Sequence, residues 1–81
     1  MVDVIFDINF KEKYKKIKDR SLKERIIKQL NKIRENPEVG KPMRYTRKGT
    51  RELYIPPYRL SYMIKTKDLI YILDLYHKNE Q

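Results

Sequence analysis

The chain has 81 residues and carries 20 Lys and Arg against 11 Asp and Glu, which gives a net charge of +9. A chain of this length forms one domain, residues 1–81, and has no room for a second core. Because cysteine is absent, the sequence excludes a disulfide framework, a thiolate nucleophile and a cysteine zinc site. The positive charge favours a polyanionic partner such as RNA, DNA or an acidic protein. A composition rich in Lys, Glu and Ile is also typical of thermophiles, in which many lysines only solvate the surface.

The sequence also indicates where the protein acts. No run has the length and hydrophobicity of a membrane span, and the first residues are too short and too charged for a signal peptide. We therefore expect a cytoplasmic protein with no membrane partner.

The N-terminal segment predicts a strand followed by a short helix. Residues 2–6 are apolar and alternate weakly, which is typical of a strand. Phe10, Tyr14 and Ile17 then recur at helical spacing among lysines, which predicts an amphipathic helix over residues 9–18.

A second helix is predicted over about residues 21–35. Ser21 and Glu24 match a capping box, with Ser21 as the N-cap residue. Asn36-Pro37 ends the helix, because proline disfavours a helical residue before it. The two antiparallel helices would cover one face of a sheet. The core-facing side of the second helix is an apolar stripe made of Leu22, Ile26, Leu30 and Ile33.

The loop that follows is strongly basic. Residues 41–51 contain five Lys and Arg and no acid, and residues 43–46 predict a short strand. Loops on a rigid sheet usually present binding groups. We therefore expect this loop to bind nucleic acid through Lys41, Arg44, Arg47 and Lys48.

The C-terminal third predicts strands over residues 53–55, 58–64 and 69–76. The second and third would form a hairpin, and the third has so few polar residues that it would be a central strand. Because side chains alternate across a strand, Arg59 would face away from the core-facing set of Tyr58, Leu60, Tyr62 and Ile64. Together these elements predict an α+β fold. It is a single small domain with an antiparallel sheet of about four strands, an N-terminal strand and a two-helix hairpin packed on one face.

Several kinds of catalytic chemistry are excluded by residue type. A single histidine, His77, rules out a histidine metal site and an acid–base histidine pair. Two glycines, Gly40 and Gly49, cannot form a Walker-type loop or a dinucleotide fingerprint. The acids are scattered, so we expect no metal and no small-molecule cofactor.

Cations and tyrosines near the sheet remain as candidate functional groups. Arg51, Arg59 and Lys78 lie at strand starts and ends. An arginine fork suits a phosphate, and a tyrosine such as Tyr58 or Tyr76 can stack on a base. Such a set can bind single-stranded RNA and neutralise a phosphorane-like transition state without a metal.

The segment R-E-L-Y-I-x-x-Y-R-L-S-Y (51–62), followed by I-L-D-L-Y-H-K (72–78), resembles the RelE/ParE superfamily of toxin–antitoxin toxins. Relatives typically carry R-x-L-R-x-G-D-Y-R-x-x-Y and a terminal H-R. The resemblance implies a RelE-like fold and a toxin of a type II system that is a metal-independent, ribosome-dependent mRNA endoribonuclease. Such a toxin cleaves mRNA in the decoding site through the RNA 2′-hydroxyl and inhibits translation. Its partners would be the ribosome, mRNA and an acidic, RelB-like antitoxin that wraps it.

The resemblance also implies site residues. Arg59 falls on the phosphate-binding arginine of the Y-R pair, and Lys78 takes the place of the terminal arginine. Arg51 or Lys48 would substitute for lysines that the superfamily carries on the strand before the Y-R pair. The RNA-binding surface would be completed by Tyr58, Tyr76 and His77.

Three departures from the superfamily pattern keep other functions open. The superfamily lysines fall at Glu52 and Thr50, which cannot serve as a lysine base or phosphate binder. Lysine at Lys78 keeps the charge of an arginine but loses its bidentate fork, and a catalytic tyrosine that some members carry has no counterpart before Gln81. The alternatives are a ParE-like gyrase-poisoning toxin and a non-catalytic RNA- or ribosome-binding module.

Overall fold

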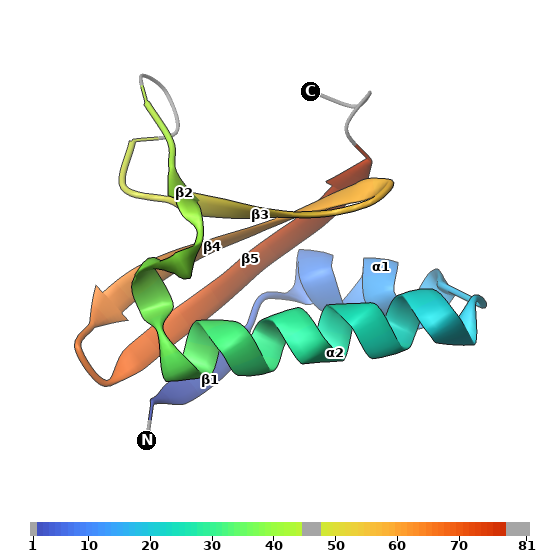
Figure 1. Cartoon of the computed structure of the whole chain (residues 1–81), viewed down its shortest axis with the longest axis horizontal. Coiled ribbons are helices and arrows are strands. Elements are labelled where there is room, and N and C mark those ends of the chain that lie inside the picture. The colour runs from blue at the N-terminus through green and yellow to red at the C-terminus, as the bar shows by residue number, and fades with distance from the viewer. Residues whose placement is uncertain (1, 45–47, 78–81) are drawn as a thin grey trace.

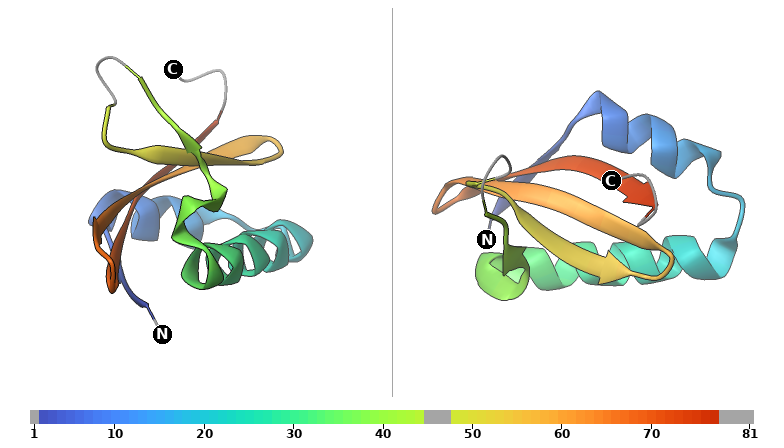
Figure 2. Two further views of the ribbon diagram at one scale, coloured as in Figure 1. Left: turned by 60° about the vertical axis from the view of Figure 1, so that its left-hand side comes forward. Right: turned by 90° about the horizontal axis from the view of Figure 1, so that it is seen from above.

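The computed structural model describes residues 2–44 and 48–77. It confirms the predicted α+β domain, with a sheet on one side and both helices on the other (Figures 1 and 2). The sheet has five strands in the order β1-β5-β4-β3-β2, where about four were predicted. Within the described ranges, neither helix is long and apolar enough to cross a membrane. The elements in chain order are β1 (Asp3–Phe6), α1 (Ile8–Lys16), α2 (Arg20–Glu35), the 3-10 helix η1 (Pro37–Val39), β2 (Lys41–Pro42), β3 (Arg51–Ile55), β4 (Tyr58–Thr66) and β5 (Leu69–His77).

Aspartates begin both helices. The Asp7 carboxylate accepts a hydrogen bond from the Asn9 backbone N–H at 2.9 Å, and Asp19 accepts one from the Leu22 N–H at 3.2 Å. The prediction that Ser21 caps the second helix is therefore wrong, since Ser21 lies inside α2. Asp19 is an equally good cap and adds a negative charge at the positive end of the helix dipole, so the helix begins earlier. The predicted stop before Pro37 is confirmed, with Asn36 as the C-cap.

The short strand before the C-terminal hairpins also differs from the prediction. Strand β2 is Lys41–Pro42, which pairs with Glu52 and Arg51, whereas a strand was predicted at residues 43–46. Of that predicted strand, Met43 and Arg44 are irregular, and residues 45–46 lie outside the described part of the chain. A proline is tolerated in β2 because this strand is at the sheet edge, where a missing N–H breaks no central ladder.

The C-terminal strands confirm the predicted hairpin and the predicted central strand. Strand β4 pairs antiparallel with β3 and with β5, and β5 lies centrally because β1 adds to its other edge in parallel. The β4–β5 turn is only Lys67–Asp68, shorter than the four polar residues predicted, because β4 continues to Thr66. The core lies between the sheet and the helices and contains Phe10, Ile17, Leu22, Ile26, Ile33, Ile55, Leu60, Tyr62, Ile70, Ile72 and Leu75.

Candidate nucleic-acid interface

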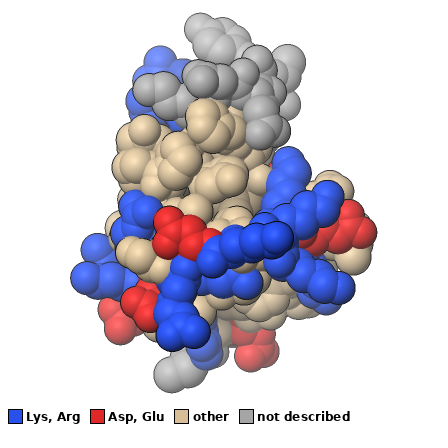
Figure 3. Space-filling model, turned by 90° about the vertical axis from the view of Figure 1, so that its right-hand side faces the viewer, with Lys and Arg blue, Asp and Glu red and all other residues tan. Residues whose placement is uncertain are grey.

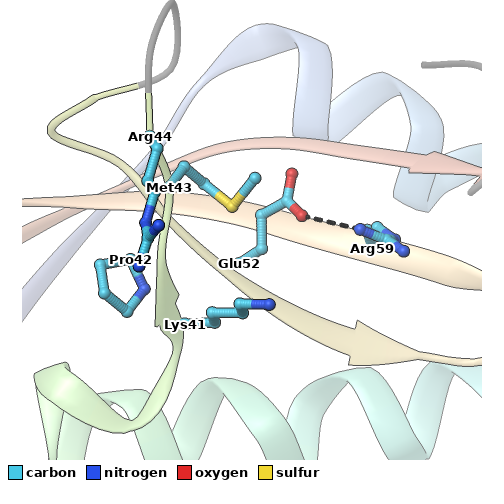
Figure 4. A pocket seen from close by; sticks show the side chains of 6 residues that line it. All are labelled: Lys41, Pro42, Met43, Arg44, Glu52 and Arg59. Atoms are coloured by element: carbon cyan, nitrogen blue, oxygen red, sulfur yellow. Dashed lines mark hydrogen bonds and ion pairs between the residues drawn. The ribbon is translucent and has the colours of Figure 1, made fainter.

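A groove of about 580 Å³ opens beside the β2 edge of the sheet (Figure 4). One wall comes from β2 and the residues after it, and the other comes from β3 and β4. It therefore brings two predicted cations of the basic loop, Lys41 and Arg44, together with Arg59 of β4 and one carboxylate. The lining residues are Lys41, Pro42, Met43, Arg44, Glu52 and Arg59.

Arg59 is held in this groove by an ion pair with Glu52. Its Nη1 donates to Glu52 Oε1 at 3.3 Å, and its guanidinium carbon lies 5.9 Å from the centre of the Tyr54 ring. Glu52 is only 7% exposed, whereas the Arg59 side chain is 37% exposed. The prediction that Arg59 faces away from the core is confirmed, but the charge that faces it there was not foreseen.

Arg51 does not join Arg59, and the prediction that it would is wrong. Strand residues alternate, so Arg51 shares the core-facing side of β3 with Leu53, while Glu52 lies on the other side. The Arg51 Nη1 donates to the backbone carbonyls of Glu38 at 3.1 Å and Gly40 at 2.7 Å. Its guanidinium therefore anchors the segment after α2 instead of facing the groove.

The Tyr62 hydroxyl completes this anchor. It donates to the Pro37 carbonyl at 2.6 Å and accepts from the Gly40 N–H at 2.8 Å. Burial raises the pKa of Tyr62 above its ordinary value of 10.0, although the Gly40 hydrogen bond and the Arg51 charge oppose the rise. A Cβ on Gly40 would lie 2.6 Å from the Tyr62 hydroxyl, so only glycine fits there. We call Arg51, Tyr62 and Gly40 the β2 clamp, because the next residue is the groove residue Lys41.

The other predicted site residues divide between the two faces of the sheet. Tyr76 is opposite Arg59 in the β4–β5 ladder and is 5% exposed. Tyr58 and His77 pair on the core-facing side with an edge-to-face contact at 5.8 Å, away from Arg59. Lys48 is exposed in the turn before β3. Arg47 and Lys78 lie outside the described residues.

The helical side of the molecule carries a different surface. Figure 3 shows Lys and Arg in a band across the end where α1 joins α2, below a surface of uncharged side chains. A hydrophobic groove of about 310 Å³ lies between the two helices, with Phe6, Phe10, Tyr14, Ile27 and Leu30 in its walls and Lys11 at its rim.

A second cavity of about 380 Å³ extends the hydrophobic groove, because it shares Phe6, Ile27 and Leu30 and continues to Arg34. Ile27 is 48% exposed, which is unusual for an isoleucine beside so many other apolar residues. The two cavities together form what we call the helix groove. Its apolar floor lies on the opposite side of the sheet from Arg59.

Comparison with known proteins identifies the family. Residues 4–81 match the model of the ParE toxin of type II toxin–antitoxin systems of the parDE type. The chain belongs to the ParE toxin family. The predicted membership of the RelE/ParE superfamily is therefore confirmed, and the protein is a toxin of a type II toxin–antitoxin system. No curated protein sequence matches the toxin.

Solved structures of toxins share its fold. The toxin resembles the RelBE2 toxin–antitoxin complex from Mycobacterium tuberculosis with a TM-score of 0.80 and 26% identity, over 95% of this chain and 98% of that chain. It resembles the YoeB–YefM complex from Staphylococcus aureus with a TM-score of 0.81 and 18% identity, over 95% and 97%. It also resembles YafQ from E. coli with a TM-score of 0.72 and 18% identity, over 99% and 97%. The predicted RelE-like fold is confirmed.

Two features of the interface were missed by sequence reasoning. The partner of the Tyr62 hydroxyl was missed because Tyr62 was assigned to packing, although a buried tyrosine usually needs a hydrogen-bond partner. The burial of Glu52 was missed because it depends on its pairing with Arg59 across two strands. The alternation of β3 was the available signal, since Glu52 lies between Arg51 and Leu53 in the sequence and therefore on the opposite face of the strand.

Proposed function

We propose that this toxin is a ribosome-dependent mRNA endoribonuclease that cleaves mRNA in the decoding site and uses the groove around Arg59 to hold the RNA backbone. The observation that carries the proposal is the meeting of Lys41, Arg44 and Arg59 in one groove. The shared fold with toxins such as RelE, YoeB and YafQ supports it.

The proposed reaction uses only the RNA, the solvent, the ribosome and the protein. The ribose 2′-oxygen attacks the adjacent phosphorus and loses its proton to solvent or to a ribosomal group. The bond from phosphorus to the 5′-oxygen breaks, and that oxygen takes up a proton. The products are a 2′,3′-cyclic phosphate and a 5′-hydroxyl.

Arg59 has the clearest role in this scheme. Its guanidinium would leave part of its contact with Glu52 and bind the non-bridging phosphate oxygens, where negative charge grows in the transition state. Lys41 and Arg44, on the opposite wall, would bind flanking phosphates and set the register of the strand.

A gyrase-poisoning activity is the second candidate, and the ion pair between Arg59 and Glu52 favours it. A toxin that binds a protein target needs no free phosphate-binding arginine. In that case the pair would stabilise the surface that the target recognises.

We also propose an acidic antitoxin as the partner. The helix groove has an apolar floor, and the charged residues among its described lining are the cations Lys11 and Arg34 and the single acid Asp3, a balance that suits an amphipathic helix with acidic flanks. The similar toxins in the RelBE2 and YoeB–YefM structures were solved together with their antitoxins.

Primer extension on an mRNA translated in vitro tests the catalytic proposal. Cuts within codons in the decoding site are expected with the wild-type toxin and are expected to be lost with Arg59→Ala. Arg20→Ala, which removes an exposed arginine at the start of α2, is the matched control and should cleave normally. Intact mRNA together with a supercoiling defect would select the gyrase alternative.

A further inference from the structure

The acid in the groove around Arg59 is the least expected feature of this toxin. Glu52 is one of two buried polar or charged residues among those that the structure describes, and the other charged residues that line its groove, Lys41, Arg44 and Arg59, are cations. Burying a carboxylate is unfavourable unless it is paired, and an apolar residue is often at least as stable at such a position. A buried glutamate here is therefore poorly explained by stability alone.

The geometry shows what Glu52 does to Arg59. The carboxylate lies at the Nη1 end of the guanidinium, the kind of position that a phosphate oxygen would take (Figure 4). The Arg59 Nε–H is buried and has no hydrogen-bond partner in the described part of the chain. The guanidinium is thus held by one carboxylate, while its Nε–H has no hydrogen bond to any described residue.

We infer that Glu52 is a built-in competitor for the RNA phosphate, which occupies Arg59 in the unbound toxin and weakens the groove's affinity for polyanions. This inference rests on the proposed role of the groove in RNA binding. A phosphate bound to Arg59 comes within a few ångströms of the Glu52 carboxylate, and two negative charges at that distance repel each other. An RNA therefore binds the groove only when several other contacts offset this repulsion. A ribosome-bound mRNA would supply such contacts, and a short free RNA would not.

The test compares charge removal at two glutamates on either side of β3. Glu52→Gln keeps an oxygen that accepts from Arg59 but removes the negative charge. Glu38→Gln is the matched control, because Glu38 is 77% exposed and lies within 4.0 Å of Arg51 on the other side of the strand. Affinity is measured by fluorescence anisotropy with a short single-stranded RNA whose riboses are 2′-O-methylated, so that cleavage cannot occur.

We expect Glu52→Gln to bind this RNA about tenfold more tightly than the wild type at low salt, a gain limited by solvent screening in an open groove. Glu38→Gln should change the affinity by less than about twofold, since its charge is exposed. Thermal unfolding verifies that each variant is folded. If Glu52→Gln does not fold, Glu52→Ala is measured instead, with the same expected gain.

Each outcome bears on a different claim. Unchanged or weaker RNA binding by the Glu52 variant would overturn the inference and make Glu52 a positioning residue for Arg59. An equal gain in Glu38→Gln would also overturn it, because the effect would then be one of net charge. Failure of both the wild type and the Glu52 variant to bind would instead remove the groove as an RNA site, and the inference with it.

Discussion

The β2 clamp makes a quantitative prediction for Tyr62→Phe. The substitution keeps the ring in the core but deletes the hydroxyl that joins the Pro37 carbonyl and the Gly40 N–H. Gly40 is buried, so its N–H loses its partner without gaining water, whereas Pro37 is only partly buried and its carbonyl is solvated more easily. A buried donor left unsatisfied destabilises a fold by about 1–3 kcal/mol. We expect a loss of about 2–3 kcal/mol in the free energy of unfolding.

Urea denaturation measures this loss, and for a domain of this size it corresponds to a fall of about 10–20 °C in Tm. Tyr71→Phe is the control, because Tyr71 is a half-buried tyrosine of β5 outside the clamp. A loss below about 0.5 kcal/mol in Tyr62→Phe, equal to that of the control, would refute the claim that the hydroxyl holds the segment before β2.

The raised pKa of Tyr62 adds a pH signature. Above about pH 10 the unfolded chain releases the phenol proton while the folded chain still keeps it. The free energy of unfolding is therefore unaffected by this group below about pH 10 and falls as the pH rises toward the pKa of the folded state. Tyr62→Phe should lack this part of the alkaline loss.

Four further predictions concern the groove and the partner. Arg59→Ala should lower the rate of mRNA cleavage on the ribosome by about 10²–10³ without unfolding the protein, and wild-type cleavage by a folded variant would contradict the proposed phosphate contact. If Lys41, Arg44 and Arg59 each contact a phosphate, the log–log salt dependence of RNA binding should have a slope of about −2, and a slope near zero would remove the nucleic-acid role. Gly40→Ala should destabilise the fold by about 1–3 kcal/mol, seen as a lower Tm, because the new methyl group would clash with the Tyr62 hydroxyl. Ile27→Asp should abolish co-purification with the antitoxin that we propose as partner, while Tm stays within a few degrees of the wild type because Ile27 is half exposed.

Periodic segments could be predicted from the sequence, whereas short pairings could not. The stripe from Leu22 to Ile33 and the apolar run of β5 each repeat over several turns or residues, so their local pattern agrees with the final packing. Strand β2 has two residues and no period, and it exists only because β3 offers an edge. The cap of α2 was misplaced because two good cap residues stand two positions apart, and the local sequence does not rank them.

The candidate site was predicted only in part. Residue type shows the charge of a side chain but not the direction in which it points. Arg59 was placed on the correct face, since its neighbours alternate clearly. Arg51 was grouped with Arg59 because of its charge and the resemblance. It nevertheless shares the alternation of the core-facing Leu53 and Ile55, so it lies on their face of β3. Its true partners, the carbonyls of Glu38 and Gly40, lie in a segment whose conformation depends on Tyr62.

The roles of neighbouring β3 residues follow from the alternation of one strand. Arg51 faces the core side and holds Gly40, and Gly40 directly precedes the groove residue Lys41. Glu52, one residue later, faces the groove and holds Arg59. A single strand therefore fixes both walls of the groove, one through the clamp and one through the ion pair. A glutamate is compatible with the RNA-binding role that we propose for this groove, because the opposite wall carries Lys41 and Arg44.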